Sequence, residues 1–276
     1  MNNITTEAAN LQKRAPVLRG RTLKMINAAG AGHPGGSLSA IDVISAVMVG
    51  RGNFRPTDQA KDWFVLGKGH AVPALYSVLI ELGFFPEQEM FTYRHLGSRL
   101  QGHPDHNKLP AVQVNTGHLG QGLSVGVGLA LAERYSNSNK KIYVVLGNGD
   151  MNEGQTWEAI QSAAKFHLSN LKVFIDDNRL TQHGLADEVM NVNPLLPKFQ
   201  DFGWWAKEID GHNYEQIVSS IDEAAQKDQP CAVICHTIKG KGVSFMENVP
   251  EWHSRNLPDD LLKKALEELF PETKGE

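Results

Sequence analysis

The chain has 276 residues, of which 41% are hydrophobic and 21% charged, and its formal net charge is -4. This composition is typical of a globular protein with a real core, and the small negative charge gives no electrostatic reason to expect nucleic acid as a partner. The chain contains no apolar run long enough to span a membrane, and its polar start, MNNITTEAANLQKRAPVLRG, lacks a signal core. We therefore expect a cytoplasmic protein of one or two domains.

Helical and extended patterns alternate from the beginning of the chain. Apolar residues recur on one face over residues 7–29, which predicts a helix. A second helix is expected after a cap region at residues 37–39, through the run IDVISAVMV. The run DWFVLG, residues 62–67, predicts a buried strand, and residues 70–82 predict a helix that tolerates Pro73 in its first turn.

The alternation continues to the end of the chain. Residues 94–117 are rich in Gly, Pro, His and Asn, which is typical of a long functional loop. The later predicted elements are a Gly- and Ala-rich helix at 120–135, a strand IYVVLG, a helix at 152–166, a strand LKVFID, a short strand near 205–209, a helix at 213–225, a strand CAVICHT and a helix at 258–269. This order predicts an α/β fold with a mainly parallel sheet covered by helices on both faces.

The two cysteines, Cys231 and Cys235, belong to one predicted strand. Four residues apart on a strand they lie roughly 13 Å from each other, too far for a disulfide. A metal site that includes His236 is an alternative, but that neighbour faces the other way. We therefore expect two buried structural cysteines.

Two polar turns follow neighbouring strands of the predicted sheet. They read GNGDMNEG, residues 147–154, and DDNRLTQHG, and ligands of such sheets bind at the carboxyl ends of strands. Gly147 and Gly149 allow a tight turn that brings N–H groups to an anion, although such turns are common. Asn178, 30 residues after Asn148, adds an amide oxygen of the kind that binds Mg²⁺ or Ca²⁺ together with diphosphate oxygens.

A Gly-X-Gly turn followed one strand later by this asparagine is the thiamine-diphosphate signature, and here the chain resembles the N-terminal part of a transketolase. The resemblance covers nearly the whole chain, and the stretches that match in order and spacing are AGHPGGSLSA, GKGHAVPALYS, GHPD, TGHLGQGLSVGVG, NEG, IDGHN and KGKGVSFMEN…WHS. It implies the thiamine-diphosphate-binding fold, with thiamine diphosphate and Mg²⁺ or Ca²⁺ as cofactors.

The resemblance also implies roles for four histidines. It places His33 and His103 at the substrate, His70 near the diphosphate and His253 near both, where imidazoles donate hydrogen bonds to sugar hydroxyls. Each one alone is better explained as a hydrogen-bonded structural histidine, but three of them beside glycines outside helices, His33, His70 and His103, favour a shared cleft. For His118, a local role in the loop is at least as well supported as contact with the substrate.

Further residues take roles from the same resemblance. Gly117 and Leu119 would lie against the aminopyrimidine of the cofactor, and Gly149 would lie at its diphosphate. Glu153, otherwise a favourable acid at a helix N-terminus, would hydrogen-bond the activating glutamate of a neighbouring chain. Other residues are given no role in the reaction. His212 is interpreted as a turn residue before the helix cap Asn213, and Lys239 and Lys241 as solvated loop charges, with a position near the mouth of the cleft as the alternative.

Asn148 departs from the family pattern, which has Asp inside Gly-Asp-Gly. The expected metal ligands are Asn148, Asn178 and the carbonyl oxygen of Leu180, together with cofactor oxygens. Alternatively Asp150 swings in, a water replaces one ligand, or Asn148 only holds the turn. Loss of a negative charge should weaken metal attraction, and our hypothesis is that Asn148→Asp restores it.

Some groups that transketolase chemistry requires are absent from this sequence. In the family, the glutamate that protonates the pyrimidine, the aromatic residues around that ring and the arginines that bind the sugar phosphate belong to later domains. We therefore expect residues 1–276 to be a single diphosphate-binding domain, inactive alone and active as an α2β2 assembly with a separately encoded C-terminal subunit.

The expected reaction transfers a two-carbon ketol unit from a ketose (phosphate) to an aldose (phosphate). The alternatives are a subunit of a pyruvate-using synthase or decarboxylase, and a non-catalytic homologue with a weakened metal site. The residues that would select the sugar are expected on the partner, so the sequence does not identify the donor or the acceptor.

Overall fold

The computed structural model describes residues 2–58 and 61–271. Its described part contains a five-stranded parallel sheet in the order β1-β2-β3-β5-β4. The strands are β1 (Trp63–Leu66), β2 (Ile142–Gly147), β3 (Leu171–Asp177), β4 (Trp205–Asp210) and β5 (Cys231–His236). The predicted parallel sheet is confirmed, with β4 as an edge strand.

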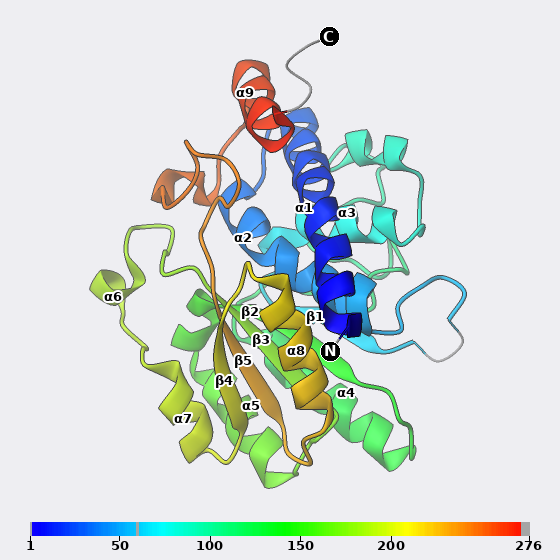
Figure 1. Ribbon diagram of the computed structural model, residues 1–276, viewed down its shortest axis with the longest axis vertical. Coiled ribbons are helices and arrows are strands. Elements are labelled where there is room, and N and C mark those ends of the chain that lie inside the picture. Colours follow the sequence, from blue (N-terminus) through cyan, green and yellow to red (C-terminus); the bar gives the residue numbers. More distant parts are fainter. Residues whose placement is uncertain (1, 59–60, 272–276) are drawn as a thin grey trace.

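Helices cover both faces of the sheet (Figure 1). One face packs against α1 (Asn2–Ala29), α2 (Pro34–Ser45), α3 (Val72–Glu81) and α8 (Tyr214–Ala225). The other face packs against α4 (Gln121–Tyr135), α5 (Gly154–Lys165) and α7 (Leu195–Asp201). A third apolar cluster joins α9 (Asp259–Leu269) to α1 and to the segment after β5. The short α6 (Ala186–Val189) and α7 are elements that the sequence patterns did not predict.

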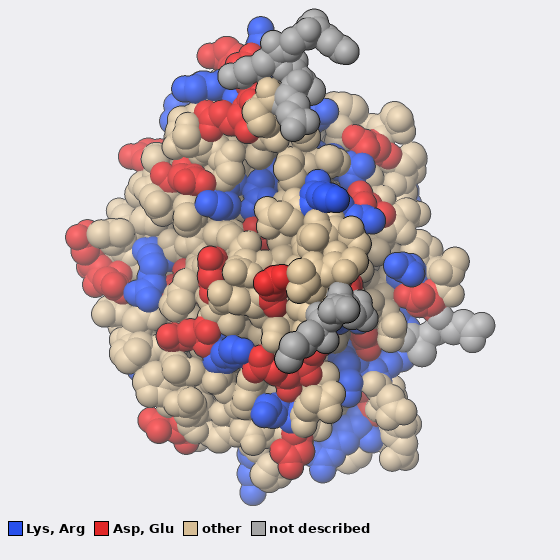
Figure 2. All heavy atoms as spheres, viewed as in Figure 1, with Lys and Arg blue, Asp and Glu red and all other residues tan. Residues whose placement is uncertain are grey.

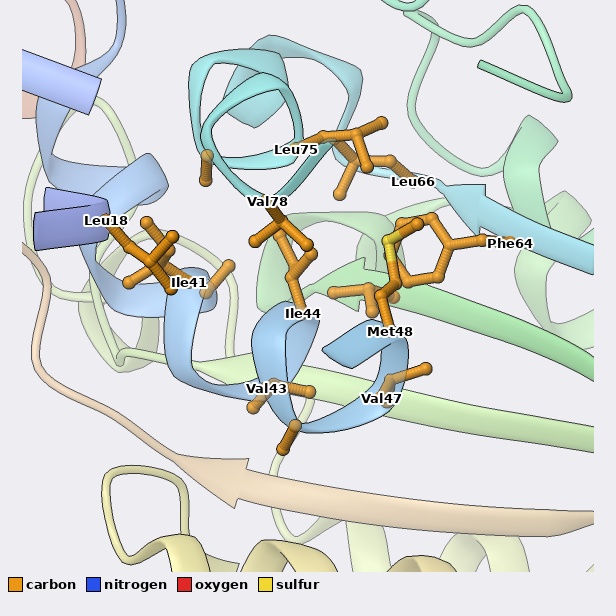
Figure 3. Packing of buried hydrophobic residues seen from close by; sticks show 14 of the residues in the cluster. Leu18, Ile41, Val43, Ile44, Val47, Met48, Phe64, Leu66, Leu75 and Val78 are labelled. Atoms are coloured by element: carbon orange, nitrogen blue, oxygen red, sulfur yellow. The ribbon is translucent and has the colours of Figure 1, made fainter. Parts of the chain in front are cut away.

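Alternate residues along the strands contribute side chains to the two apolar clusters, one on each face of the sheet. Phe64 and Leu66 belong to the cluster under α2 and α3, whereas Val65 belongs to the cluster on the opposite face. Figure 3 shows Leu66 next to Leu75 and Phe64 next to Met48. Because burial of each large apolar side chain stabilises the fold by about 1.5–3 kcal/mol, these contacts hold the strand ends, and the turns that follow them, in place.

The second helix begins earlier than the sequence pattern predicted. It starts at Pro34, a residue whose fixed φ suits the first helical position, and not after the expected cap at residues 37–39. Ser37 lies inside the helix, where its hydroxyl donates to the His33 carbonyl at 2.7 Å. Gly35 is required by close packing, since a Cβ there would lie 2.8 Å from the carbonyl oxygen of Trp252.

The remaining predictions agree with the structure to within a few residues. Helix α1 begins before the expected position, and α3 and α5 follow short 3₁₀ turns at Gly69–Ala71 and Asn148–Asn152. Asn213 caps α8, with its side chain accepting from the Gln216 N–H at 3.1 Å. Both cysteines are free and buried, as expected.

The surface and the described helices add two observations. Acidic and basic side chains are interspersed over the face in Figure 2, without a large region of one sign. Within residues 2–58 and 61–271, no helix has the length and apolar character needed to cross a membrane.

Candidate active site

A cavity of about 290 Å³ lies where four parallel strands end. Lys68 follows β1, Asn148 follows β2, Asn178 follows β3 and Lys239 follows β5, and all four border it. The other residues of the sequence-derived site that line this cavity are His70, Leu119, Gly149, Glu153, Leu180 and His253. His103 and Gly117 line a second cavity of about 580 Å³, together with His118.

Asp150 holds the first polar turn to a neighbouring loop. One carboxylate oxygen accepts from the Gly147 N–H at 2.8 Å and the other from the Gly120 N–H at 2.9 Å. Burial raises the pKa of Asp150 even though both hydrogen bonds act to lower it. Because both of its oxygens are committed to backbone N–H groups, Asp150 is less suited than Asn148 to bind a metal in the cavity.

Asn148 and Asn178 present amide groups to the same cavity. The Nδ2 of Asn148 is buried and has no hydrogen-bond partner in the structure, which is an unfavourable state for a buried polar atom. Asn178 is held more firmly: its Nδ2 donates to Ser39 Oγ at 3.2 Å and its Oδ1 accepts from the Leu180 N–H at 3.1 Å. The unpartnered amide is consistent with a bound group that completes this site.

Gly149 leaves room for such a group. A Cβ at this position would meet only Leu119 Cδ1, at 3.7 Å, which is ordinary contact. Its φ also lies outside the left-handed range that favours glycine. Within the part of the chain that the structure describes, no neighbour therefore requires glycine at this position, whereas close approach of a ligand to the backbone would.

Two buried lysines, Lys68 and Lys239, border the cavity. Of the two, the sequence patterns singled out only Lys239, as a loop charge with a position near the mouth of the cleft as its alternative. Lys68 forms an ion pair with Asp176, and the two side chains are only 3% and 0% exposed. Lys239 donates to the Thr181 carbonyl at 2.8 Å and contacts His253 Nδ1 at 3.0 Å. Burial, reinforced by the charge of Lys68, lowers the pKa of Lys239 to about 8. The only signal in the sequence is that each lysine precedes a glycine shortly after a buried strand.

Three of the predicted histidines form a cluster of rings. The ring centroids lie 5.1 Å apart for His33 and His70, 5.3 Å for His70 and His253, and 5.6 Å for His33 and His253. Burial lowers the pKa of His33 to about 4 and that of His253 to about 3, and it lowers the pKa of His70 well below 6.5. All three rings are therefore neutral near pH 7, and His33 Nδ1 is buried without a hydrogen-bond partner among the described residues.

The other predicted residues lie at the two cavities. A Cβ on Gly117 would lie 3.3 Å from the His103 ring, and burial together with the charge of Arg94 lowers the pKa of His103. Glu153 is exposed and precedes the first turn of α5. Gly120, with φ 78°, lets the preceding loop pass Glu153, because a Cβ there would lie 2.6 Å from the Glu153 Cβ.

The histidine cluster predicts a specific loss of stability in acid. Because the folded-state pKa values lie below the ordinary 6.5, the stabilisation is fully present above about pH 6.5 and is lost as the pH falls toward about 4 for His33 and about 3 for His253. Each histidine kept neutral adds about 1.4 kcal/mol per pH unit to the slope of unfolding free energy.

Urea unfolding of the full chain between pH 4 and 7 measures this slope. We expect a shallower dependence for His33→Gln than for the wild type, whereas His95→Gln, at an exposed position, should keep the wild-type slope. An identical pH dependence in all three proteins would contradict the prediction.

The parallel sheet, the glycine turn and the two buried lysines that border the cavity suit a domain that binds a diphosphate group. The chain belongs to the transketolase family: residues 11–272 match the family described as "Transketolase, thiamine diphosphate binding domain".

Relatives of two lengths match the chain. An apulose-4-phosphate transketolase subunit of Actinobacillus succinogenes is 36% identical, over 99% of this chain and 100% of that protein. The 6-deoxy-6-sulfo-D-fructose transketolase subunit SqwG of a Clostridium species is 37% identical, over 98% of this chain and 99% of that protein. The crystal structure of Campylobacter jejuni transketolase has a TM-score of 0.86 and 30% identity, over 94% of this chain but 42% of that one.

Proposed function

We propose that this chain is the diphosphate-binding subunit of a split transketolase, which transfers a two-carbon ketol unit from a ketose to an aldose. The observation that carries the proposal is the share of each relative's length that this chain covers. Two proteins named as transketolase subunits match the chain almost from end to end, whereas it spans only 42% of Campylobacter jejuni transketolase. A separately encoded partner then supplies the rest of the site in an α2β2 assembly in the cytoplasm.

The cavity residues fit thiamine diphosphate and a divalent cation. Lys68, Lys239 and His70 would hold the diphosphate, with the Gly149 backbone close beside it. Two lysines near a dianion supply charge that a glycine turn alone does not.

The divalent cation, Mg²⁺ or Ca²⁺, would take the amide oxygens of Asn148 and Asn178 and the Leu180 carbonyl. Among the described residues, no group of three His, Cys, Asp or Glu side chains is arranged to bind a metal. A cation here therefore depends on neutral oxygens and on the diphosphate itself. When bound, thiamine diphosphate supplies the carbon nucleophile and the electron sink of the reaction.

The chain's own contribution to the chemistry is a set of neutral imidazoles. His33, His103 and His253 would hold the hydroxyl and carbonyl groups of the sugar, because a neutral ring both donates and accepts hydrogen bonds. His33 and His253 are half-buried and His103 is exposed on this chain, so the partner would complete the exclusion of water from the site. Glu153, exposed on this chain, would meet the activating glutamate of the partner.

The substrates we propose are sugars or sugar phosphates. The two subunit-length relatives are named for apulose-4-phosphate and for 6-deoxy-6-sulfo-D-fructose. Both names describe a sugar that carries an anionic group. The groups that select between phosphate and other anionic ends would come from the partner.

An assay of the reconstituted assembly tests the proposal. We expect the chain alone to be inactive and the mixture with its partner to transfer a two-carbon unit from ketose donors, in the presence of thiamine diphosphate and Mg²⁺. Turnover of pyruvate in place of ketoses would assign the assembly to another class of thiamine enzyme. Calorimetry that detects no thiamine diphosphate binding would indicate a non-catalytic homologue.

A further inference from the structure

A buried ionic network joins α1, α2 and the turn before α8. Its centre is Asp42, which is 2% exposed. The carboxylate accepts hydrogen bonds from Arg19 Nη2 at 2.5 Å, His212 Nδ1 at 2.7 Å and Tyr214 OH at 2.9 Å. Burial acts to raise the pKa of Asp42, but the charge of Arg19 and the hydrogen bond from His212 outweigh it and hold the pKa below its ordinary value. The network therefore contains a buried, ionised carboxylate.

His212 connects this carboxylate to the segment that follows β5. Its Nε2 accepts from the backbone N–H of Ile238 at 2.8 Å. A backbone N–H can only donate, so Nε2 carries no proton and the proton of the neutral ring is on Nδ1, facing Asp42. The contacts on both sides thus select one tautomer and one orientation of the ring.

Arg19 provides a second attachment to the same segment. While its Nη2 binds Asp42, its Nε donates to the carbonyl of Lys241 at 3.0 Å. The network therefore holds the N–H of Ile238 and the carbonyl of Lys241, one on each side of Lys239.

The backbone between these two attachments is sharply bent. Gly240 has φ 81°, and its N–H donates to the Gly35 carbonyl at 3.0 Å. From this bend the Lys239 side chain enters the cavity, where it reaches the Thr181 carbonyl and His253. A small shift of the bend would move the ammonium group away from both partners.

We propose that the Arg19–Asp42–His212 network is a positioning device for Lys239, with His212 as the positioning residue that fixes the Ile238 amide. The proposal rests on the proposed function, because it gives the buried network a purpose at the diphosphate site. His212 does not touch the cavity itself; it acts through the backbone on the lysine that does. The turn role expected for His212 is thereby extended to the cofactor site.

Two substitutions separate the two hydrogen bonds of His212. In His212→Gln the side-chain oxygen can stand where Nε2 stands and accept from Ile238, while contact with Asp42 is weakened. In His212→Asn the shorter amide can still donate to Asp42 but does not reach Ile238. Tyr214→Phe is the matched control, since it removes a hydrogen bond to the same carboxylate and leaves His212 in place.

Two measurements distinguish positioning from general stability. The first is amide hydrogen exchange at Ile238 in the full chain without cofactor, compared at equal unfolding free energy. We expect exchange about tenfold faster in His212→Asn, as for loss of a buried hydrogen bond, and near wild type in His212→Gln and Tyr214→Phe. The second is thiamine diphosphate binding with Mg²⁺ in the assembly with the partner, where we expect a dissociation constant raised about five- to tenfold in His212→Asn only.

Each outcome bears on the proposal. If His212→Asn and His212→Gln show the same exchange at Ile238 and the same cofactor affinity, His212 serves stability alone and the proposal is wrong. If His212→Asn does not fold, wild-type exchange at Ile238 in His212→Gln together with faster exchange in His212→Ala would support the proposal, and equal exchange in these two would overturn it. Failure of the wild-type assembly to bind thiamine diphosphate would refute the proposed function, while the exchange experiment would still decide the role of His212.

Discussion

Replacing Lys68 by methionine should destabilise the fold by about 3 kcal/mol, near the lower end of the range for breaking a buried ion pair. The change leaves the Asp176 carboxylate, which is 1% exposed, without its cation. Asp176 keeps hydrogen bonds from Ser39 Oγ at 2.6 Å and from the hydroxyl of Thr237, which is why we do not expect a larger loss. Urea unfolding of the full chain near pH 7 measures the effect.

The same substitution should weaken cofactor binding for a separate reason. The Lys68 ammonium borders the cavity, so its removal takes away one of the two positive charges expected to face the diphosphate. Thiamine diphosphate binding must therefore be compared at equal folded fraction, with denaturation monitored in parallel. A loss of stability without a loss of affinity would show that Lys68 serves the fold alone.

A matched control and a rescue separate these effects. Lys207→Met removes a lysine whose pair with Glu223 is on the surface, 37% and 41% exposed, and should cost less than about 1 kcal/mol. Adding Asp176→Asn to Lys68→Met removes the unpaired buried charge and should recover much of the lost stability but none of the lost affinity. Equal costs for Lys68→Met and Lys207→Met would refute the account of a buried pair.

The sequence was sufficient to place the rim of the site. Short continuous apolar runs located β2 and β3 and the two turns after them, because the strands of a parallel sheet are buried on both faces and their carboxyl ends meet at one edge. Asn148 and Asn178 consequently border one cavity, as their spacing implied. The roles of the individual side chains there remain predictions.

The charges of the site could not be predicted in the same way. A lysine beside a glycine in a loop is normally solvated, and only the tertiary structure brings Asp176 to Lys68 and Thr181 to Lys239. The role of Asp150 was hidden for the same reason, since one of its partners, the Gly120 N–H, comes from a different loop. Hydrogen bonds between segments distant in sequence leave no local pattern.

The start of α2 shows a conflict between local propensity and packing. Gly35 and Gly36 are poor helix formers, so the sequence favoured a start at the serines that follow. In the structure a Cβ on Gly35 would lie 2.8 Å from the Trp252 carbonyl oxygen, which leaves no room for a side chain, and one on Gly36 would lie 3.3 Å from the His70 ring, which leaves little. The tertiary contact therefore overrides the propensity. His33, which the sequence placed in a loop well before the helix, is therefore the N-cap residue of α2.

Asn148→Asp should make Mg²⁺ binding in the presence of thiamine diphosphate about 10–100-fold tighter. A unit charge about 4 Å from another contributes about 4 kcal/mol at an effective dielectric constant of 20, and the cost of burying the carboxylate removes part of this gain. Without metal, the substitution should destabilise the fold, because the new carboxylate would be buried close to Asp150, whose pKa burial already raises. We therefore expect the metal-free variant to unfold more easily than the wild type, and the metal-loaded one less easily.

Asn152→Asp is the matched control, because Asn152 borders the same cavity but is exposed. Solvent and salt screen a charge there, so its Mg²⁺ affinity should change by no more than about threefold. Calorimetric Mg²⁺ titration of the assembly at saturating thiamine diphosphate measures all three proteins, and thermal unfolding with and without Mg²⁺ checks the change of sign. If both aspartate variants gained equally, the effect would be one of general charge, and if Asn148→Asp gained nothing, Asn148 would hold only the turn. A gain confined to Asn148→Asp would mean that the side chain at position 148 is a metal ligand. Because the wild-type side chain there is uncharged, this chain would then bind its cation chiefly through the diphosphate.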